Sequence, residues 1–274
     1  MSNLPKITIV TPSYNQGKFL RETIESVINQ DYPNLEYFII DGGSTDESVD
    51  IIREYEDRID WWVSEKDKGQ SDAINKGFRK ASGELLCWVN SDDILLPGCL
   101  QEVGSSYIEN GKPELIHSNF LYIDQNSLVT RMIRIPKLSR FFMYRGVWSV
   151  SVPSSFFSKQ LLGEIGYLNV NYHISMDLDT WMKMIEKGAR IHHIPKYLGA
   201  FRRHQDSKTL KLLQLRKKRD GSSEHTRIFD AALPETTYKS RKIWRLVWKF
   251  YQLINLNYLR SFIETLIFRR KQMM

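Results

Sequence analysis

The sequence has 274 residues, of which 42% are hydrophobic and 26% charged, and this globular composition excludes a chain that is disordered throughout. There are only two cysteines, Cys87 and Cys99, and one disulfide would be a weak framework for a chain of this length, which argues against a disulfide-stapled scaffold. The two form no CxxC pair, which argues against a zinc ribbon. We expect a cytoplasmic protein, because the N-terminus lacks a signal-peptide pattern and no charge-free apolar stretch approaches the ~20 residues of a spanning helix.

The net charge of +7 is unevenly distributed along the chain. Residues 1–201 hold 21 Lys and Arg against 26 Asp and Glu, whereas residues 202–274 hold 18 against 6. The body is therefore mildly acidic and the C-terminal part strongly basic. A basic segment of this kind meets nucleic acid, anionic lipid or only water, and all three alternatives stay open on charge alone.

The first hundred residues alternate between strand and helix patterns. A short, apolar and β-branched run predicts a strand over 6–10, and further strands are expected over 35–40, 59–63 and 85–89. Apolar residues at helical spacing predict helices over 19–28, from Asp46 to Tyr55, and over 73–81. This alternation predicts an α/β fold with a mostly parallel sheet and helices on both faces.

The second half of the chain is less regular. We expect strands over 114–119, 128–133, 190–194 and 198–202, an extended segment over 146–157 and a helix over 177–187. The tail over 241–270 reads as helical, with basic and aromatic residues interleaved.

Polar clusters follow three of the predicted strands, at residues 11–15, 41–46 and 90–93. Ligands of open α/β sheets bind beyond the carboxyl ends of the strands, so these clusters predict a binding site. The loop after the first strand carries no GxGxxG, and the chain has no P-loop, which argues against a dinucleotide or Walker-type site.

Asp92 and Asp93 stand directly after a buried strand. Adjacent carboxylates repel each other unless a positive charge lies nearby, and a divalent cation bound to a diphosphate would meet that need. The alternative is a helix N-cap formed by Ser91 or Asp92. The strand-end position, with Asp41 expected one loop away, favours the cation.

Four motifs in order resemble those of family 2 glycosyltransferases. They are Thr-Pro-Ser-Tyr-Asn at 11–15, Asp-Gly-Gly-Ser-Thr-Asp at 41–46, the segment from Asp67 to Gly77, and Asn-Ser-Asp-Asp at 90–93. The resemblance covers roughly residues 6–205 and implies the GT-A fold, a Rossmann-like domain that binds a nucleotide-diphospho-sugar. It divides the chain into a GT-A domain over 1–205 and a basic, mainly helical extension over 206–274.

The resemblance also implies residue roles. The expected nucleotide-binding residues are Thr11, Pro12, Tyr14, Asp41, Asp72, Ser91 and Asp92. Asp92 and Asp93 match the element that holds Mg²⁺ or Mn²⁺ against the diphosphate, and His204, in an Arg-x-His pattern, is a further candidate metal ligand beside a structural alternative. This chain has Asn90 where the family often has Asp, which implies a less absolute metal dependence.

Asp177 matches the family's acceptor-side carboxylate and is the expected catalytic base, with a helix N-cap as the alternative. Inverting transfer needs a base on the attacking acceptor hydroxyl. Asp179, two residues further on, is expected to be structural.

The implied function is inverting transfer of a sugar, from a UDP-sugar by family frequency, to a hydroxyl of a glycan or lipid-linked acceptor, as in cell-surface polysaccharide synthesis. The alternatives are a sugar-nucleotide-binding protein without turnover and a membrane-docking scaffold. The basic amphipathic tail predicts peripheral attachment to the anionic inner face of the cell membrane, against packing on the domain or an oligomer contact. No nucleic acid is expected, because no recognised binding module occurs and the body is acidic.

Overall fold

The computed structural model describes residues 4–135, 141, 145, 152–208, 227–228, 238–254 and 257–272. Its first elements are β1 (Ile7–Ser13), α1 (Gly17–Ile28), β2 (Leu35–Asp41), α2 (Ser48–Glu54), the 3₁₀ turn η1 (Glu56–Arg58), β3 (Trp61–Ser64), α3 (Gln70–Lys80) and β4 (Leu85–Trp88). The predicted alternation of strands and helices is confirmed, with boundaries shifted by a few residues.

The later elements are β5 (Ile94–Leu95), α4 (Cys99–Glu109), β6 (Leu115–Ile123), β7 (Val129–Ile133), η2 (Val152–Ser154), β8 (Ser155–Ser158), α6 (Lys159–Glu164), α7 (Met176–Glu186), β9 (Ile191–Arg202), α10 (Tyr238–Ile254) and α11 (Asn257–Gln272). The two strands expected over 190–194 and 198–202 are one long strand, β9, with register shifts against β6. The extended segment expected over 146–157 lies outside the described residues as far as 151.

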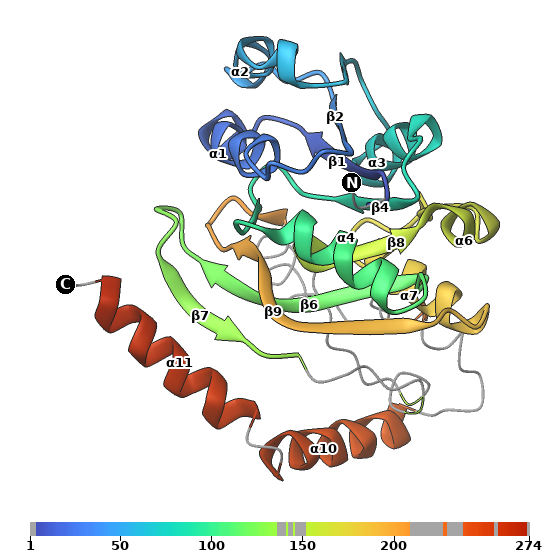
Figure 1. The fold of residues 1–274 in the computed structure, drawn as a ribbon, viewed down its shortest axis with the longest axis vertical. Coiled ribbons are helices and arrows are strands. Elements are labelled where there is room, and N and C mark those ends of the chain that lie inside the picture. The colour runs from blue at the N-terminus through green and yellow to red at the C-terminus, as the bar shows by residue number, and fades with distance from the viewer. Residues whose placement is uncertain are drawn as a thin grey trace.

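In the described part of the chain the strands form one nine-stranded sheet in the order β3-β2-β1-β4-β8-β6-β9-β5, with β7 added to β6. The first four neighbours run parallel, as predicted. Beyond them β8 runs antiparallel to both β4 and β6, so the second half of the sheet is mixed. The α/β fold with parallel strands at its N-terminal half is thereby confirmed (Figure 1).

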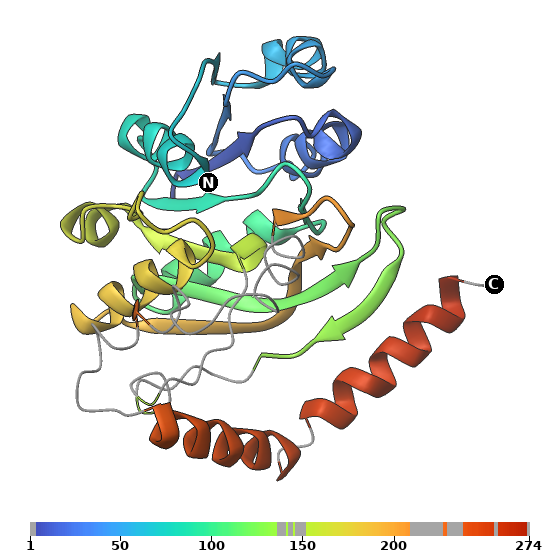
Figure 2. The same ribbon diagram turned by 180° about the vertical axis from the view of Figure 1, so that it is seen from behind.

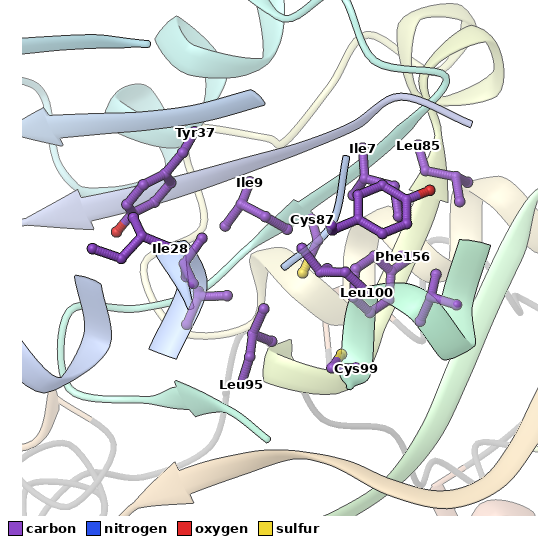
Figure 3. Close-up of a cluster of buried hydrophobic side chains, with 14 of the residues drawn as sticks. Ile7, Ile9, Ile28, Tyr37, Leu85, Cys87, Leu95, Cys99, Leu100 and Phe156 are labelled. Carbon is purple, nitrogen blue, oxygen red and sulfur yellow. The ribbon is translucent and has the colours of Figure 1, made fainter. Parts of the chain in front are cut away.

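Helices cover both faces of the sheet because alternate strand residues point to opposite sides. On one face α1, α2 and α4 pack on a buried cluster that includes Ile7, Ile9 and Cys87 (Figure 3). On the other face α3, α6 and α7 pack on a cluster that includes Val10 and Trp88 (Figure 2). Both cysteines are buried free thiols.

A close approach holds α3 against β1. A Cβ atom on Gly77 would lie 2.7 Å from both Cγ atoms of Val10, so only glycine allows this distance. The contact sets the position of the start of α3, which lies near the carboxyl end of β1. Gly69, which directly precedes α3, has a φ of 109°, a backbone conformation that favours glycine.

The C-terminal helices α10 and α11 follow one another along the margin of the molecule, and α11 runs beside β7 (Figures 1 and 2). The helical extension expected from the sequence is confirmed. Within the described residues, none of the helices has the length and apolar content needed to cross a membrane.

Candidate active site

A pocket of about 360 Å³ opens at the carboxyl ends of β1 and β4. The start of α3, the residues that lead into α7, and the segment 201–208 complete its walls. This is the edge of the sheet at which the polar clusters were expected to meet. Five of the predicted site residues line it, namely Pro12, Tyr14, Ser91, Asp92 and Asp177.

Hydrogen bonds brace the two loops that follow β1 and β2 against each other. The backbone N–H of Asn15 donates to Ser44 Oγ at 2.8 Å, and the N–H of Thr45 donates to Asn15 Oδ1 at 2.8 Å. Asp46 accepts from the N–H groups of Gly17 and Ser48, at the starts of α1 and α2. The bracing holds the Tyr14 side chain at the pocket while leaving it 60% exposed.

Asp41 is fully enclosed beneath these loops. Its carboxylate accepts hydrogen bonds from Ser44 Oγ at 2.5 Å, Ser64 Oγ at 2.7 Å and the N–H groups of Gly43 and Ser44. The residue thus joins the loop after β2 to the end of β3. Its expected contact with a nucleotide stays a prediction.

Two other predicted nucleotide residues, Thr11 and Asp72, are not among those that line the pocket. Thr11 is buried and shares a hydrogen bond of 3.0 Å with the Tyr37 hydroxyl. Asp72 accepts from the N–H of Lys68 at 3.0 Å in the first turn of α3. Both side chains stabilise elements that shape the pocket.

Asp92 and Asp93 point in different directions. The Asp92 carboxylate lines the pocket, and its Oδ2 lies 2.9 Å from His204 Nε2. Asp93 is turned into the protein, where its carboxylate accepts from the Arg202 backbone N–H and from Asn90 Nδ2, each at 2.9 Å. Burial and the charge of Asp92 raise the pKa of Asp93 well above its ordinary value.

His204 is buried beside the pocket, and its ring packs on Phe19 with centroids 4.6 Å apart. Two of the three predicted metal ligands, Asp92 and His204, are therefore in contact. The Asp93 carboxylate instead accepts hydrogen bonds from Asn90 in its own loop and from the Arg202 backbone. Among the residues that the structure describes, no three His, Cys, Asp or Glu side chains are grouped closely enough to hold a metal ion.

Asp177 is the second residue of α7 and lines the pocket from a different element than Asp92 does. Its Oδ1 accepts from the N–H of Leu178 at 2.8 Å. Asp179 does not line the pocket and pairs with Lys183 at 2.7 Å along the helix. The structure thus separates the two carboxylates as expected.

Sequence reasoning did not identify Arg202 as important. The side chain is fully buried and donates to the Asp92 and Asp124 carbonyl oxygens, to Ser127 Oγ and to Glu22. It ties the loop that carries Asp92 to α1 and to the β6–β7 turn. Only its neighbour in sequence, His204, was singled out.

A chain of side chains links the segment 201–208 to the same loop. Lys208 Nζ donates to Gln70 Oε1 at 3.1 Å, Gln70 Nε2 donates to Asn90 Oδ1 at 2.7 Å, and Asn90 Nδ2 donates to Asp93. Asn90, which departs from the family pattern, is therefore a donor that an aspartate could not replace. The residues 206–208 line the pocket although the predicted boundary assigns them to the extension.

Three buried polar atoms on the pocket wall have no hydrogen-bond partner within the described part of the chain: Ser13 Oγ, Trp88 Nε1 and Ser207 Oγ. Buried polar groups are normally satisfied, so these three atoms are exceptions, and they belong to residues that line the pocket. The carboxylates of Asp67, Asp92, Asp177 and Asp206 also line the pocket. These carboxylates would repel a bound diphosphate, whereas Lys208, which also lines the pocket, would attract it.

A glycosyl transferase family 2 model matches residues 8–165, more than half of the chain. An uncharacterized glycosyltransferase of Rickettsia felis is 28% identical over 222 residues, which are 76% of this chain and 36% of that protein. One from Haemophilus influenzae is 33% identical over 50% of this chain and 57% of its own length. The chain thus spans about a third to a little over half of these two relatives.

A putative teichuronic acid biosynthesis glycosyltransferase of Bacillus subtilis, TuaG, is 24% identical over 72% of this chain and 79% of its own length. Among solved structures, TarS of S. aureus in complex with UDP superimposes with a TM-score of 0.61 at 19% identity, covering 84% of this chain and 70% of that one. The mannosyltransferase PcManGT of Pyrobaculum calidifontis, in complex with GDP-Man and Mn²⁺, gives 0.58 at 16% identity, covering 97% and 86%.

Proposed function

The chain belongs to glycosyltransferase family 2, and we propose that it transfers a sugar from a UDP-sugar, with inversion, to a hydroxyl of a glycan or lipid-linked acceptor. The observation that carries this proposal is the pocket at the carboxyl ends of β1 and β4, which Asp92 and Asp177 reach from separate elements. TarS, solved with UDP and with UDP-GlcNAc, supports a uridine donor, and TuaG supports a role in surface polysaccharide synthesis.

In the proposed reaction Asp177 is the general base. Its carboxylate accepts the proton of the acceptor hydroxyl while that oxygen forms a bond to the anomeric carbon and the bond to the diphosphate oxygen breaks. Asp177 lies in the first turn of α7 and is one of the residues that line the pocket, which is the position this role requires. We assign contact with the nucleotide base to Tyr14, whose exposed ring lines the pocket together with Pro12.

The residues present fit a divalent cation, Mg²⁺ or Mn²⁺. Such a cation in nucleotide sites is held by one or two carboxylates together with phosphate oxygens and water. Asp92 would supply one carboxylate, and His204, with Nε2 2.9 Å from Asp92 Oδ2, would be a further ligand. When bound, the cation would offset the charge of the leaving diphosphate. The fixed carbonyl contacts of Arg202 hold the Asp92 loop for that purpose.

We place the reaction at the inner face of the cell membrane, where lipid-linked acceptors are found. The basic C-terminal extension is the part of the chain that supports this location.

The test combines donor binding and transfer on the same folded preparation. Calorimetry with UDP and GDP, each with and without MnCl₂, identifies the nucleotide, and a panel of UDP-sugars is then assayed for hydrolysis or transfer. Asp177→Asn is expected to retain UDP affinity within about twofold while transfer falls about 10²–10⁴-fold. Asp179→Asn is the matched control, because this carboxylate is two residues away and does not line the pocket.

Equal rates for Asp177→Asn and the wild type would remove Asp177 as the base and leave it as part of the helix start. Tight UDP binding without turnover of any sugar nucleotide would favour the alternative, a sugar-nucleotide-binding protein. GDP binding in place of UDP would overturn the choice of donor alone.

A further inference from the structure

Helix α11 packs on the sheet with its polar side. Ser261 and Thr265 are buried, and they accept hydrogen bonds from the N–H groups of Arg134 at 3.1 Å and Met132 at 3.0 Å, respectively. Glu264, on the same side, pairs with the Arg134 guanidinium and accepts from the Tyr197 hydroxyl. A helix of a water-soluble domain normally turns its apolar side to the protein, so this arrangement is inverted.

The apolar side of α11 consequently faces outward. Its five members are each 44–60% exposed: Leu259, Phe262, Ile263, Leu266 and Ile267. They recur at intervals of three and four residues and therefore form one stripe along the helix. We call them the α11 stripe.

Helix α10 carries a second stripe of this kind. Its members are 41–64% exposed: Ile243, Leu246, Val247, Phe250 and Leu253. The helix contacts the rest of the protein through other residues, among them Trp248, which is buried. Within the part of the chain that the structure describes, two consecutive helices thus expose their apolar stripes, which is more than the scattered apolar residues of an ordinary surface.

The charges beside the stripes distinguish between possible occupants. Arg245 and Lys249 on α10 and Arg260 on α11 are exposed, and residues 202–274 hold 18 basic against 6 acidic residues. A second copy of the chain would bring two basic extensions together, and lysine is depleted from the centres of protein interfaces. Anionic lipid attracts each basic residue and also accepts apolar side chains at the boundary between headgroups and acyl chains.

We propose that α10 and α11 bind the surface of an anionic lipid bilayer, with both apolar stripes inserted at that boundary. The idea that sugar transfer occurs at this bilayer surface rests on the proposed function. Lipid binding itself can be measured without any sugar donor.

The experiment is co-sedimentation of the full chain with vesicles of phosphatidylcholine alone or mixed equally with phosphatidylglycerol. We expect binding to the mixed vesicles that weakens as salt increases. Phe250→Gln and Phe262→Gln should each weaken vesicle binding about tenfold, because each removes a large apolar side chain that would be buried in the bilayer. Lys249→Gln should weaken it about fivefold.

Ile108→Gln is the matched control, because Ile108 is also exposed (43%) but lies on α4, away from both stripes. It should leave vesicle binding unchanged. Circular dichroism and UDP affinity, expected unchanged in all these variants, separate a lost lipid contact from a lost fold.

A wild-type chain that stays in the supernatant with mixed vesicles would overturn the proposal, as would equal binding by the Phe262→Gln and Ile108→Gln variants. A wild-type dimer that Phe262→Gln converts to a monomer, without vesicle binding, would assign the stripes to a second copy. Vesicle binding by a chain that binds no nucleotide would uphold this surface and refute the proposed function separately.

Discussion

Replacing Arg202 with methionine should destabilise the protein and weaken donor binding together. The guanidinium is fully buried and lies over the Phe19 ring, with 4.9 Å between its central carbon and the ring centroid. Methionine retains much of the apolar stem but none of the donors. The substitution therefore removes the ties between the Asp92 loop, α1 and the β6–β7 turn.

The magnitude follows from the groups left behind. The Asp92 and Asp124 carbonyl oxygens each lose a buried donor, which costs about 1–3 kcal/mol apiece. The Glu22 side chain is 43% exposed, so water replaces the guanidinium there and the lost ion pair adds little. We expect the free energy of unfolding to fall by roughly 2–6 kcal/mol for Arg202→Met.

Urea denaturation followed by fluorescence measures this change, and calorimetry on the folded fraction measures UDP affinity. Glu22→Gln, which keeps an acceptor at the exposed end of the same pair, should lose less than about 1 kcal/mol. Arg202→Lys keeps the charge without the planar fork and should fall between the two. If Arg202→Met unfolds at the same urea concentration as Glu22→Gln, the carbonyl contacts do not stabilise the loop as argued.

Three further predictions concern the metal pair, a buried histidine and the α3 contact. Asp92→Asn and His204→Gln should each abolish stimulation of transfer by MnCl₂ while leaving the melting temperature within a few degrees, and activity that persists in excess chelator would refute the metal assignment. His117 is fully buried, and its burial, together with the nearby His193 and His192, lowers its pKa well below 6.5. As the pH falls below 6.5, His117 is therefore protonated in the unfolded chain but not in the folded one. The free energy of unfolding should consequently fall by up to about 1.4 kcal/mol per pH unit below pH 6.5. His117→Phe should flatten that slope in denaturant titrations from pH 7 to 5, and an unchanged slope would assign it to other groups. Gly77→Ala should lower the free energy of unfolding by about 1–3 kcal/mol, because the added Cβ overpacks against Val10. Gly163→Ala is the control: its added Cβ would meet nothing closer than 3.7 Å, so the loss in the same urea titration should be less than half as large.

The parallel half of the sheet and the position of the pocket could be predicted from sequence because local patterns determine both. Strand runs such as 6–10 and 85–89 are short and apolar, and polar residues follow them directly. Parallel strands bring their carboxyl ends to one edge, so Tyr14, Ser91 and Asp92 were expected to meet. Their meeting requires no knowledge of side-chain orientation.

Orientation is what the sequence could not supply. Asp92 and Asp93 are adjacent and chemically identical, yet only the backbone conformation of the loop decides that one faces the pocket and the other accepts from Arg202. Arg202 likewise reads as one more basic residue in a basic segment until long-range contacts with Glu22 and Asp124 enclose it. The antiparallel position of β8 between β4 and β6 likewise depends on pairing between strands that lie far apart in the sequence.

The hydroxyls of Ser261 and Thr265 have a consequence for any shortened form of this chain. They cover the N–H group of Met132 in β7 and that of Arg134, the residue that follows Ile133 at the end of the strand. A chain cut before α11 would present those groups as an open strand edge, to which a strand of another molecule can add. Such a fragment should self-associate through backbone pairing at β7, and Thr265→Val in the full chain should produce a milder form of the same behaviour.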